Sequence, residues 1–356
     1  MKFLNKASII LIIFLVIIIP VIAILLNSNT NKLIEKNAAN AQSYAKTAAE
    51  NKAKTEALYA EISNEIPGIV CIGSDLMAST GTVNTTFAGS LQTKLTDNGY
   101  KIPIVNLAVP QENVLTILGR IGVKPFVVAK SVTIPEKADL IDIEIESTDE
   151  GYVWPLAISS DNAHFNPVTI GEFNGMIGGE SEKDSETGEN KHYFVRSEDG
   201  EAFTIPAGSV INTSSDDEYK DYVHIIWIGE NDKWSDFEDL AVNIKDIIDS
   251  CGKNKGRYIV MGLPKGNGET MEEYDDIMNE HFGSHYLNVR KYLSGYDLSK
   301  TDITFDDNDK AQQEQGIVPK CLLQDNGNLN DVAYKLLTDF VYEGLVANDC
   351  IKKPEN

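Results

Sequence analysis

Four short polar blocks in this sequence carry side chains that could do acyl-transfer chemistry. Gly73-Ser-Asp-Leu76 follows an apolar run at 69–72, and Gly229-Glu-Asn-Asp232 follows another at 222–228. The other two blocks are Asn106-Leu-Ala-Val-Pro-Gln-Glu112 and Asp325-Asn-Gly-Asn-Leu-Asn330. Hydroxyl, carboxylate and amide groups of this kind serve hydrolases as nucleophile, base-orienting group and oxyanion donor. The blocks are far apart in the sequence, so this chemistry depends on a fold that brings them together.

Apolar and amphipathic segments alternate through most of residues 66–350, which is typical of a parallel sheet with helices on both faces. The expected strands cover 69–72, 102–109, 222–228, 257–263 and 286–289. The expected helices cover 87–95, 114–120, 236–250, 271–282 and 332–345. Each of the first three polar blocks follows or closes one of these strands, where the ligand site of a parallel sheet lies.

Between about residues 126 and 215 the pattern changes to short alternating strands, with Gly, Pro and Asp turns between them. The candidate strands cover 128–134, 140–146, 168–173, 192–196 and 201–205. The polar run 178–190 is expected to be an exposed hairpin tip. This region predicts a β-rich insertion in the α/β domain.

The four blocks, in this order, resemble those of the SGNH (GDSL-type) hydrolases, which include bacterial esterases, lipases and carbohydrate deacetylases. Gly229-Glu-Asn-Asp232 matches the Gly-x-Asn-Asp block of that family outright, and the likeness covers about residues 67 to 346. The resemblance implies a flavodoxin-like, three-layer α/β/α domain. It also implies serine acyl transfer, in which a Ser attacks, a His takes its proton and an Asp orients the His.

Only part of that catalytic set is present. By the resemblance, Asn231 keeps the oxyanion amide and Asp325 keeps the orienting carboxylate. The nucleophile position holds Asp75, with Ser74 one residue earlier. The base position holds Asn328, which cannot accept and return a proton near neutral pH.

The second block adds a further expected loss. The glycine turn of the family is replaced by Pro110-Gln111, and a proline has no N–H to donate to an oxyanion. Because removal of the Ser or the His of a triad lowers turnover about a million-fold, we expect a catalytically degenerate protein. The alternative is an active esterase or carbohydrate deacetylase with Ser74 as a rearranged nucleophile. That shift re-aims the hydroxyl, and a misplacement of about 1 Å can cost roughly a hundred-fold.

If the fold holds, four of these side chains converge in one cleft: Asp75, Asn231, Asp325 and Asn328, with Glu112 nearby. Carboxylates that share a cleft raise the pKa of one of their number unless a cation is present. Oxygen-only ligands suit Ca²⁺, Mg²⁺ or hydroxyl-rich sugars, whereas solvated polar residues in a relic cleft are the simpler interpretation. No resident cofactor is expected, and the expected ligand is a glycan or an acylated small molecule.

The histidines and cysteines give no stronger site. His224 lies in an apolar strand and is interpreted as a core residue with satisfied hydrogen bonds. His281 and His285 could share a helix face as metal ligands, but Gly283 separates them and no third ligand is evident, so a surface pair is favoured. The four cysteines are too few for a disulfide framework and are expected to be unpaired.

The first 65 residues are predicted to form a membrane anchor and a stalk. Residues 7–26 are uncharged and apolar, and that length spans a bilayer as one helix. Lys2 and Lys6 precede this run, so residues 1–27 are expected to form a cytoplasmic tip and an uncleaved signal anchor, a cleaved signal peptide being the alternative. Residues 28–65 contain no Gly and predict a helical stalk. Self-association through a coiled coil of this stalk is left open as an alternative to a single helix.

The charge of the chain restricts its partners. With 54 acidic and 31 basic side chains, its formal charge is −23, which repels nucleic acid and anionic headgroups. A hydrophobic content of 42% argues against a disordered acidic chain. The sequence as a whole predicts a single-pass membrane protein with residues 66–350 outside the cell, acting as a recognition or scaffold module on a bacterial surface.

Overall fold

The computed structural model describes Lys46 and residues 66–83, 86–148, 165–183, 190–215, 217–234, 236–266 and 269–352. Apart from Lys46, these residues belong to one compact unit within Ile66–Asn356. The expected anchor at 7–26, and the stalk except for Lys46, lie outside the described residues. Within the described part of the chain, no helix is long and apolar enough to cross a membrane.

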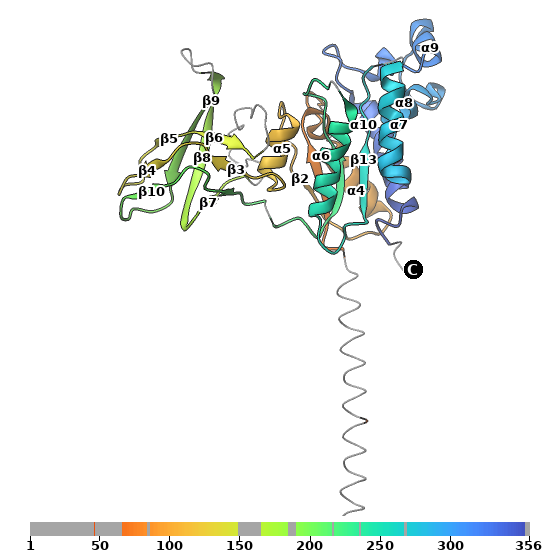
Figure 1. Ribbon diagram of the computed structural model, residues 1–356. Coiled ribbons are helices and arrows are strands. Elements are labelled where there is room, and N and C mark those ends of the chain that lie inside the picture. The colour runs from red at the N-terminus through yellow and green to blue at the C-terminus, as the bar shows by residue number, and fades with distance from the viewer. Residues whose placement is uncertain are drawn as a thin grey trace, which may run out of the picture. The chain divides into compact units, whose positions relative to one another are not determined.

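A five-stranded parallel sheet has the order β14-β13-β12-β1-β2. Figure 1 labels β2 and β13 of this sheet among the helices. The strands of the sheet are β1 Ile69–Gly73, β2 Ile104–Asn106, β12 Val223–Trp227, β13 Tyr258–Met261 and β14 Tyr286–Leu287. β1 and β12 are buried at every position, as expected of strands covered on both faces. This is the order of a doubly wound sheet, in which ligands bind outside the carboxyl ends of the strands.

Two hydrophobic cores cover the two faces of the sheet, and β1 contributes to both by alternation. Ile69 and Cys71 pack in the core that includes α4 and α10, whereas Val70 and Ile72 pack in the core that includes α5, α6 and α7. The α-helices are α3 Asp75–Ala78, α4 Phe87–Asp97, α5 Val114–Arg120, α6 Phe237–Ser250, α7 Glu269–Phe282, α8 Val289–Ser294, α9 Asp307–Glu314 and α10 Asp331–Ala347. Short 3-10 helices cover η3 Gly283–His285, η4 Leu298–Lys300 and η5 Lys320–Leu322. The expected α/β alternation with a parallel sheet is confirmed, although β2 is shorter than the predicted 102–109.

Between α5 and β12 the chain forms antiparallel sheets in the order β11-β7-β8-β9-β5, β10-β4 and β3-β6. The strands are β3 Phe126–Val128, β4 Val132–Ile134, β5 Ile141–Ile143, β6 Ile145–Ser147, β7 Val168–Ile170, β8 Phe173–Lys183, β9 Asn190–Arg196, β10 Phe203–Ile205 and β11 Ile211–Asn212. The aromatic residues Phe126, Phe165 and Phe194 are buried in their core.

The polar run 178–190, expected to be an exposed hairpin tip, lies where β8 and β9 pair as antiparallel neighbours, in agreement with a hairpin. β8 continues into the run to Lys183 and β9 begins at Asn190, so the strands extend further than expected. Pairing of Gly178 with Tyr193 and of Gly179 with His192 belongs to this extension. Residues 184–189 lie outside the described residues.

Candidate functional site

The site begins at the turn where β1 passes into α3. A Cβ atom on Gly73 would lie 2.5 Å from the Met77 Cβ and 2.5 Å from the Trp227 carbonyl oxygen, so only glycine fits this close approach. The tight passage leaves Ser74 fully buried and Asp75 half-buried at the carboxyl end of the sheet. The position that the sequence assigned to a nucleophile therefore lies where the fold places a ligand site.

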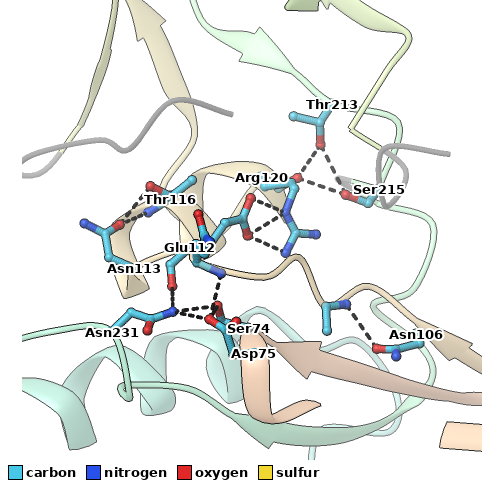
Figure 2. Close-up of polar contacts among 12 residues, drawn as sticks. Ser74, Asp75, Asn106, Glu112, Asn113, Thr116, Arg120, Thr213, Ser215 and Asn231 are labelled. Atoms are coloured by element: carbon cyan, nitrogen blue, oxygen red, sulfur yellow. Dashed lines mark hydrogen bonds and ion pairs between the residues drawn. The ribbon is translucent and has the colours of Figure 1, made fainter. Parts of the chain in front are cut away.

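The Asp75 carboxylate receives hydrogen bonds from two converging donors (Figure 2). Its Oδ2 accepts the N–H of Gln111 at 2.8 Å and the Asn231 Nδ2 at 2.9 Å. The same Nδ2 also lies 2.8 Å from the Ser74 Oγ and 3.1 Å from the Glu112 carbonyl oxygen. A backbone N–H and an amide aimed at one oxygen form the kind of site that stabilises an oxyanion. Here a carboxylate of the protein itself occupies that site.

The second block has no N–H at Pro110, as expected, but it still supplies a backbone donor. Pro110 has no N–H, but the N–H of the next residue, Gln111, makes the hydrogen bond to Asp75. Gln111 adopts a left-handed backbone conformation with φ of 69°, and this conformation directs its N–H towards the carboxylate. Glycine is the residue for which this φ carries no steric penalty.

The effect of a substitution at Gln111 on the free energy of unfolding should therefore depend on how well the new residue tolerates a positive φ. We expect Gln111→Gly to change the free energy of unfolding by less than about 1 kcal/mol, because relief of strain offsets the added chain entropy. Gln111→Val should lower it by about 1–3 kcal/mol, because a β-branched residue is poorly tolerated at positive φ. Urea unfolding of both variants checks the difference. Equal losses for Gly and Val would show that the side chain of Gln111, and not its φ, matters.

Ser74, the alternative nucleophile, is held inside the protein. Its side chain has 0% exposure, and its Oγ is bound by Asn231 at 2.8 Å. The hydroxyl donates towards Asp75 Oδ2 at 3.4 Å. In this arrangement Ser74 supports the carboxylate and does not face a substrate.

A cavity of about 470 Å³ opens beside Asp75 at the carboxyl ends of β1, β12 and β13. Three acidic residues, Asp75, Glu230 and Asp232, line it. Its aromatic and apolar lining comprises Trp234, Phe237, Leu263, Pro264 and Met271, together with Leu76 and Gly229. Asn231, Asn328 and Lys265 complete the lining, and the Lys265 Nζ lies 3.4 Å from the Asn328 Oδ1. The volume is in the range of small-molecule sites.

The expected convergence is met by three residues and not by the fourth. Asp75, Asn231 and Asn328 line the cavity, whereas Asp325 is exposed and is not part of its lining. The Gln324 N–H donates to the Asn328 carbonyl at 2.7 Å, which closes a turn with Asp325 near its tip. Asp325 is thus turned to solvent by local hydrogen bonds that the block pattern does not encode.

Glu230 and Asp232 are site residues that the sequence reasoning did not single out. Glu230 Oε1 accepts the N–H of Leu76 at 3.1 Å, while its buried Oε2 has no hydrogen-bond partner among the described residues. Burial raises the pKa of Glu230 to about 7, and the charges of Asp75 and Asp232 add to the rise. Burial also raises the pKa of Asp232. The sequence could have pointed to both residues through their position, since they lie just after the buried strand β12.

A buried ion pair supports the second block from behind. Three hydrogen bonds of 2.7–3.0 Å join the Arg120 guanidinium to the Glu112 carboxylate, and the two side chains are 1% and 3% exposed. Burial raises the pKa of Glu112, and the Arg120 charge opposes that rise. The Glu112 carbonyl accepts Asn231, and the Arg120 carbonyl accepts the hydroxyls of Thr213 and Ser215 (Figure 2). Glu112 is therefore near the site through its backbone, with its carboxylate turned away.

The described histidines lie elsewhere. His224 Nδ1 is 2.9 Å from the Tyr222 carbonyl and 3.3 Å from the Cys251 Sγ, which agrees with a satisfied core residue. His281 contacts Glu238 and His285 contacts the Tyr258 carbonyl, each at 2.8 Å. Within the described ranges, no three His, Cys, Asp or Glu side chains are grouped closely enough to hold a metal ion. The four cysteines are free.

Comparisons with known proteins give one distant likeness. No family model matches the chain, and no curated protein matches it. Among solved structures, the lipase/acylhydrolase from Enterococcus faecalis is similar, with a TM-score of 0.42 and 11% sequence identity over 82% of this chain and 100% of that chain. This likeness is too distant to establish a family. The described residues themselves establish a mixed α/β domain whose parallel sheet carries an acidic cavity at the carboxyl ends of its strands.

Proposed function

We propose that this chain is an SGNH-hydrolase-like protein whose cleft binds a ligand without hydrolysing it. One observation carries the proposal: Asp75 Oδ2 already occupies the point on which the Gln111 N–H and Asn231 Nδ2 converge. A substrate carbonyl would need these donors for the charge that develops on its oxygen. The carboxylate both fills that position and repels an incoming negative charge.

The composition of the cavity wall supports the same proposal. No histidine is found among the described residues that line the cavity, and the family's base position is Asn328. An amide cannot relay the proton that a serine nucleophile must lose. Loss of either nucleophile or base from a triad lowers turnover about a million-fold, and this chain lacks both at the family positions.

The kinship to SGNH hydrolases rests on four features. The first and third blocks follow adjacent strands β1 and β12, and the second follows β2. Gln111 has a positive φ where the family has glycine. Asn231 donates to the residue at the nucleophile position. The strand order is that of flavodoxin-like sheets.

The cellular setting is proposed from the sequence. The apolar run at 7–26 would anchor the chain in a membrane, and residues 28–65 would hold the α/β domain away from it on the outside. An anchored, acidic binding domain suits a recognition or scaffold module of a bacterial surface. Its ligand would be a glycan or an acylated small molecule.

Hydrolysis assays test this proposal. The full chain in non-ionic detergent, with Ser74→Ala and Asp75→Ala variants, is offered short-chain aryl esters and acetylated sugars. We expect the same background rate from all three proteins, because Ser74 is fully buried and no histidine is found among the described residues that line the cavity. Turnover by the wild type that Ser74→Ala abolishes would overturn the proposal in favour of an esterase or deacetylase with a rearranged nucleophile. Turnover lost only in Asp75→Ala would point to a carboxylate nucleophile and would overturn it as well.

A further inference from the structure

The three carboxyl groups of the acidic cavity differ from two buried carboxylates of this protein, because those two are paired with arginines. Glu112 is paired with Arg120, and Asp275 is paired with Arg290, both inside the protein. By contrast, none of the three carboxyl side chains in the cavity wall forms an ion pair among the described residues. A carboxylate that is shielded from water and has no ion-pair partner is costly, and three half-buried carboxylates share this cavity, so the site is suited to a cation from outside.

The wall offers that cation both hydrogen bonds and aromatic faces. Asp75 and Asp232 are half-buried at the cavity, and Asp75 keeps Oδ1 without a hydrogen bond within the described structure. Trp234 and Phe237 line the same space. The Trp234 indole is held by its Nε1 hydrogen bond to the Gly229 carbonyl at 2.9 Å. Ammonium groups bind to carboxylates and to the faces of such rings.

We propose that the ligand of this cavity carries a primary ammonium group, recognised by Asp75 and Asp232 and by the charge of Glu230. This inference rests on the proposed function, namely that the cleft binds a ligand and does not hydrolyse it. The shared chemistry is the charged amine, whether it belongs to an amino sugar or to an aliphatic amine. Lys265 also lines the cavity but is exposed, and it lies near Asn328.

Glu230 gives the binding a defined pH dependence. Its Oε2 is enclosed, so it acts through charge and not through contact. Because burial raises its pKa to about 7, Glu230 holds a proton below that pH and adds no negative charge to the cavity. As the pH rises through 7 this proton is released to solvent, and the affinity for a ligand that remains an ammonium ion should rise. The groups that face it are Asp75 from α3, Asp232 after β12, Lys265 after β13, Tyr274 from α7 and Tyr334 from α10. Burial raises the pKa of both tyrosines, so they stay neutral in this range.

Calorimetric titration of the full chain in non-ionic detergent tests the proposal. The probes are benzylamine, with benzyl alcohol as its neutral counterpart, and glucosamine, with N-acetylglucosamine as its neutral counterpart. We expect each amine to bind at least about tenfold more tightly than its counterpart, since charge-assisted hydrogen bonds exceed neutral ones by about that factor. The two pairs distinguish an aliphatic from a sugar amine, and CaCl₂ is titrated separately as a metal probe.

Three variants locate the effect. Asp232→Asn should weaken amine binding about tenfold, because it removes one charged acceptor. Glu230→Gln should bind benzylamine, which stays protonated in this range, with little change in affinity between about pH 6 and pH 8, where the wild type gains affinity. Glu273→Gln, a matched change on the exposed side of α7, should behave as the wild type.

Several results would overturn the inference. These are equal or tighter binding of the neutral probes, the absence of heat with both amines, or a response to Ca²⁺ alone. Neutral sugar binding with background hydrolysis would remove the ammonium inference and leave the proposed function standing. Ester turnover would remove the proposed function, and the amine preference would then be judged on its own titration.

Discussion

Replacing Arg120 with methionine is expected to lower the free energy of unfolding by about 3–5 kcal/mol, the largest loss that we expect from a single change near the site. The substitution leaves the Glu112 carboxylate, only 3% exposed, without the three hydrogen bonds that Arg120 provides. An uncompensated charge in the interior must then be solvated by rearrangement or neutralised by a proton. Urea unfolding followed by far-UV circular dichroism measures the loss.

Two further variants distinguish the effect of breaking this buried ion pair from the effect of removing any positive charge. Lys130→Met breaks the exposed pair with Glu144 and should change the free energy of unfolding by less than about 1 kcal/mol. The double variant Glu112→Leu/Arg120→Met should be less destabilised than Arg120→Met alone, because it leaves no unpaired charge. A loss below about 1 kcal/mol in Arg120→Met would contradict the role that we assign to this pair. Strict additivity in the double variant would contradict it too.

The parts of the fold that follow from local pattern could be predicted. The strand 69–72 and the helix 236–250 were evident from apolar runs and from an apolar helix face, and both are present as β1 and α6. The approach of Asp75 to Asn231 also follows from pattern, because each comes after a strand and the two strands are neighbours. Parallel pairing turns a sequence separation of 156 residues into a contact of 2.9 Å.

Other features depend on backbone conformation or on burial, which residue types do not reveal. The donor N–H of Gln111 arises from its positive φ, whereas the sequence showed only a proline before it. Asp325 is carried out of the cleft by a turn of a few residues. The raised pKa of Glu230 requires knowledge of what covers its carboxyl group. Sequence-based predictions therefore fail at site residues whose positions depend on single local hydrogen bonds. The sheet is predicted more reliably, because it depends on apolar patterns that extend over many residues.

Glu230→Gln is expected to stabilise the protein by about 3 kcal/mol at about pH 8 and to change little below about pH 4, where Glu230 is protonated in both folded and unfolded chains. Burial raises the folded pKa of Glu230 to about 7, above an unfolded value of about 4.3. Between these two values the unfolded chain holds fewer protons on this residue, so wild-type stability falls as pH rises through them. Gln stays neutral and can still accept the Leu76 N–H. Unfolding free energies of both proteins, measured across this pH range, check the prediction.

The pH dependence of the difference is the decisive readout. Glu273→Gln changes an exposed carboxylate on α7 and should show no such trend. A constant difference between wild type and Glu230→Gln at all pH values would mean that Glu230 is ionised in the folded protein without cost, and the argument from its burial would fail. If the trend is present, benzylamine should reduce it in the wild type and not in Glu230→Gln, because a bound cation stabilises the ionised carboxyl group. Glu230 would then lower the stability of the fold at neutral pH while adding negative charge to the cavity. A loss of stability in exchange for ligand binding is the trade-off expected of a residue with a binding role.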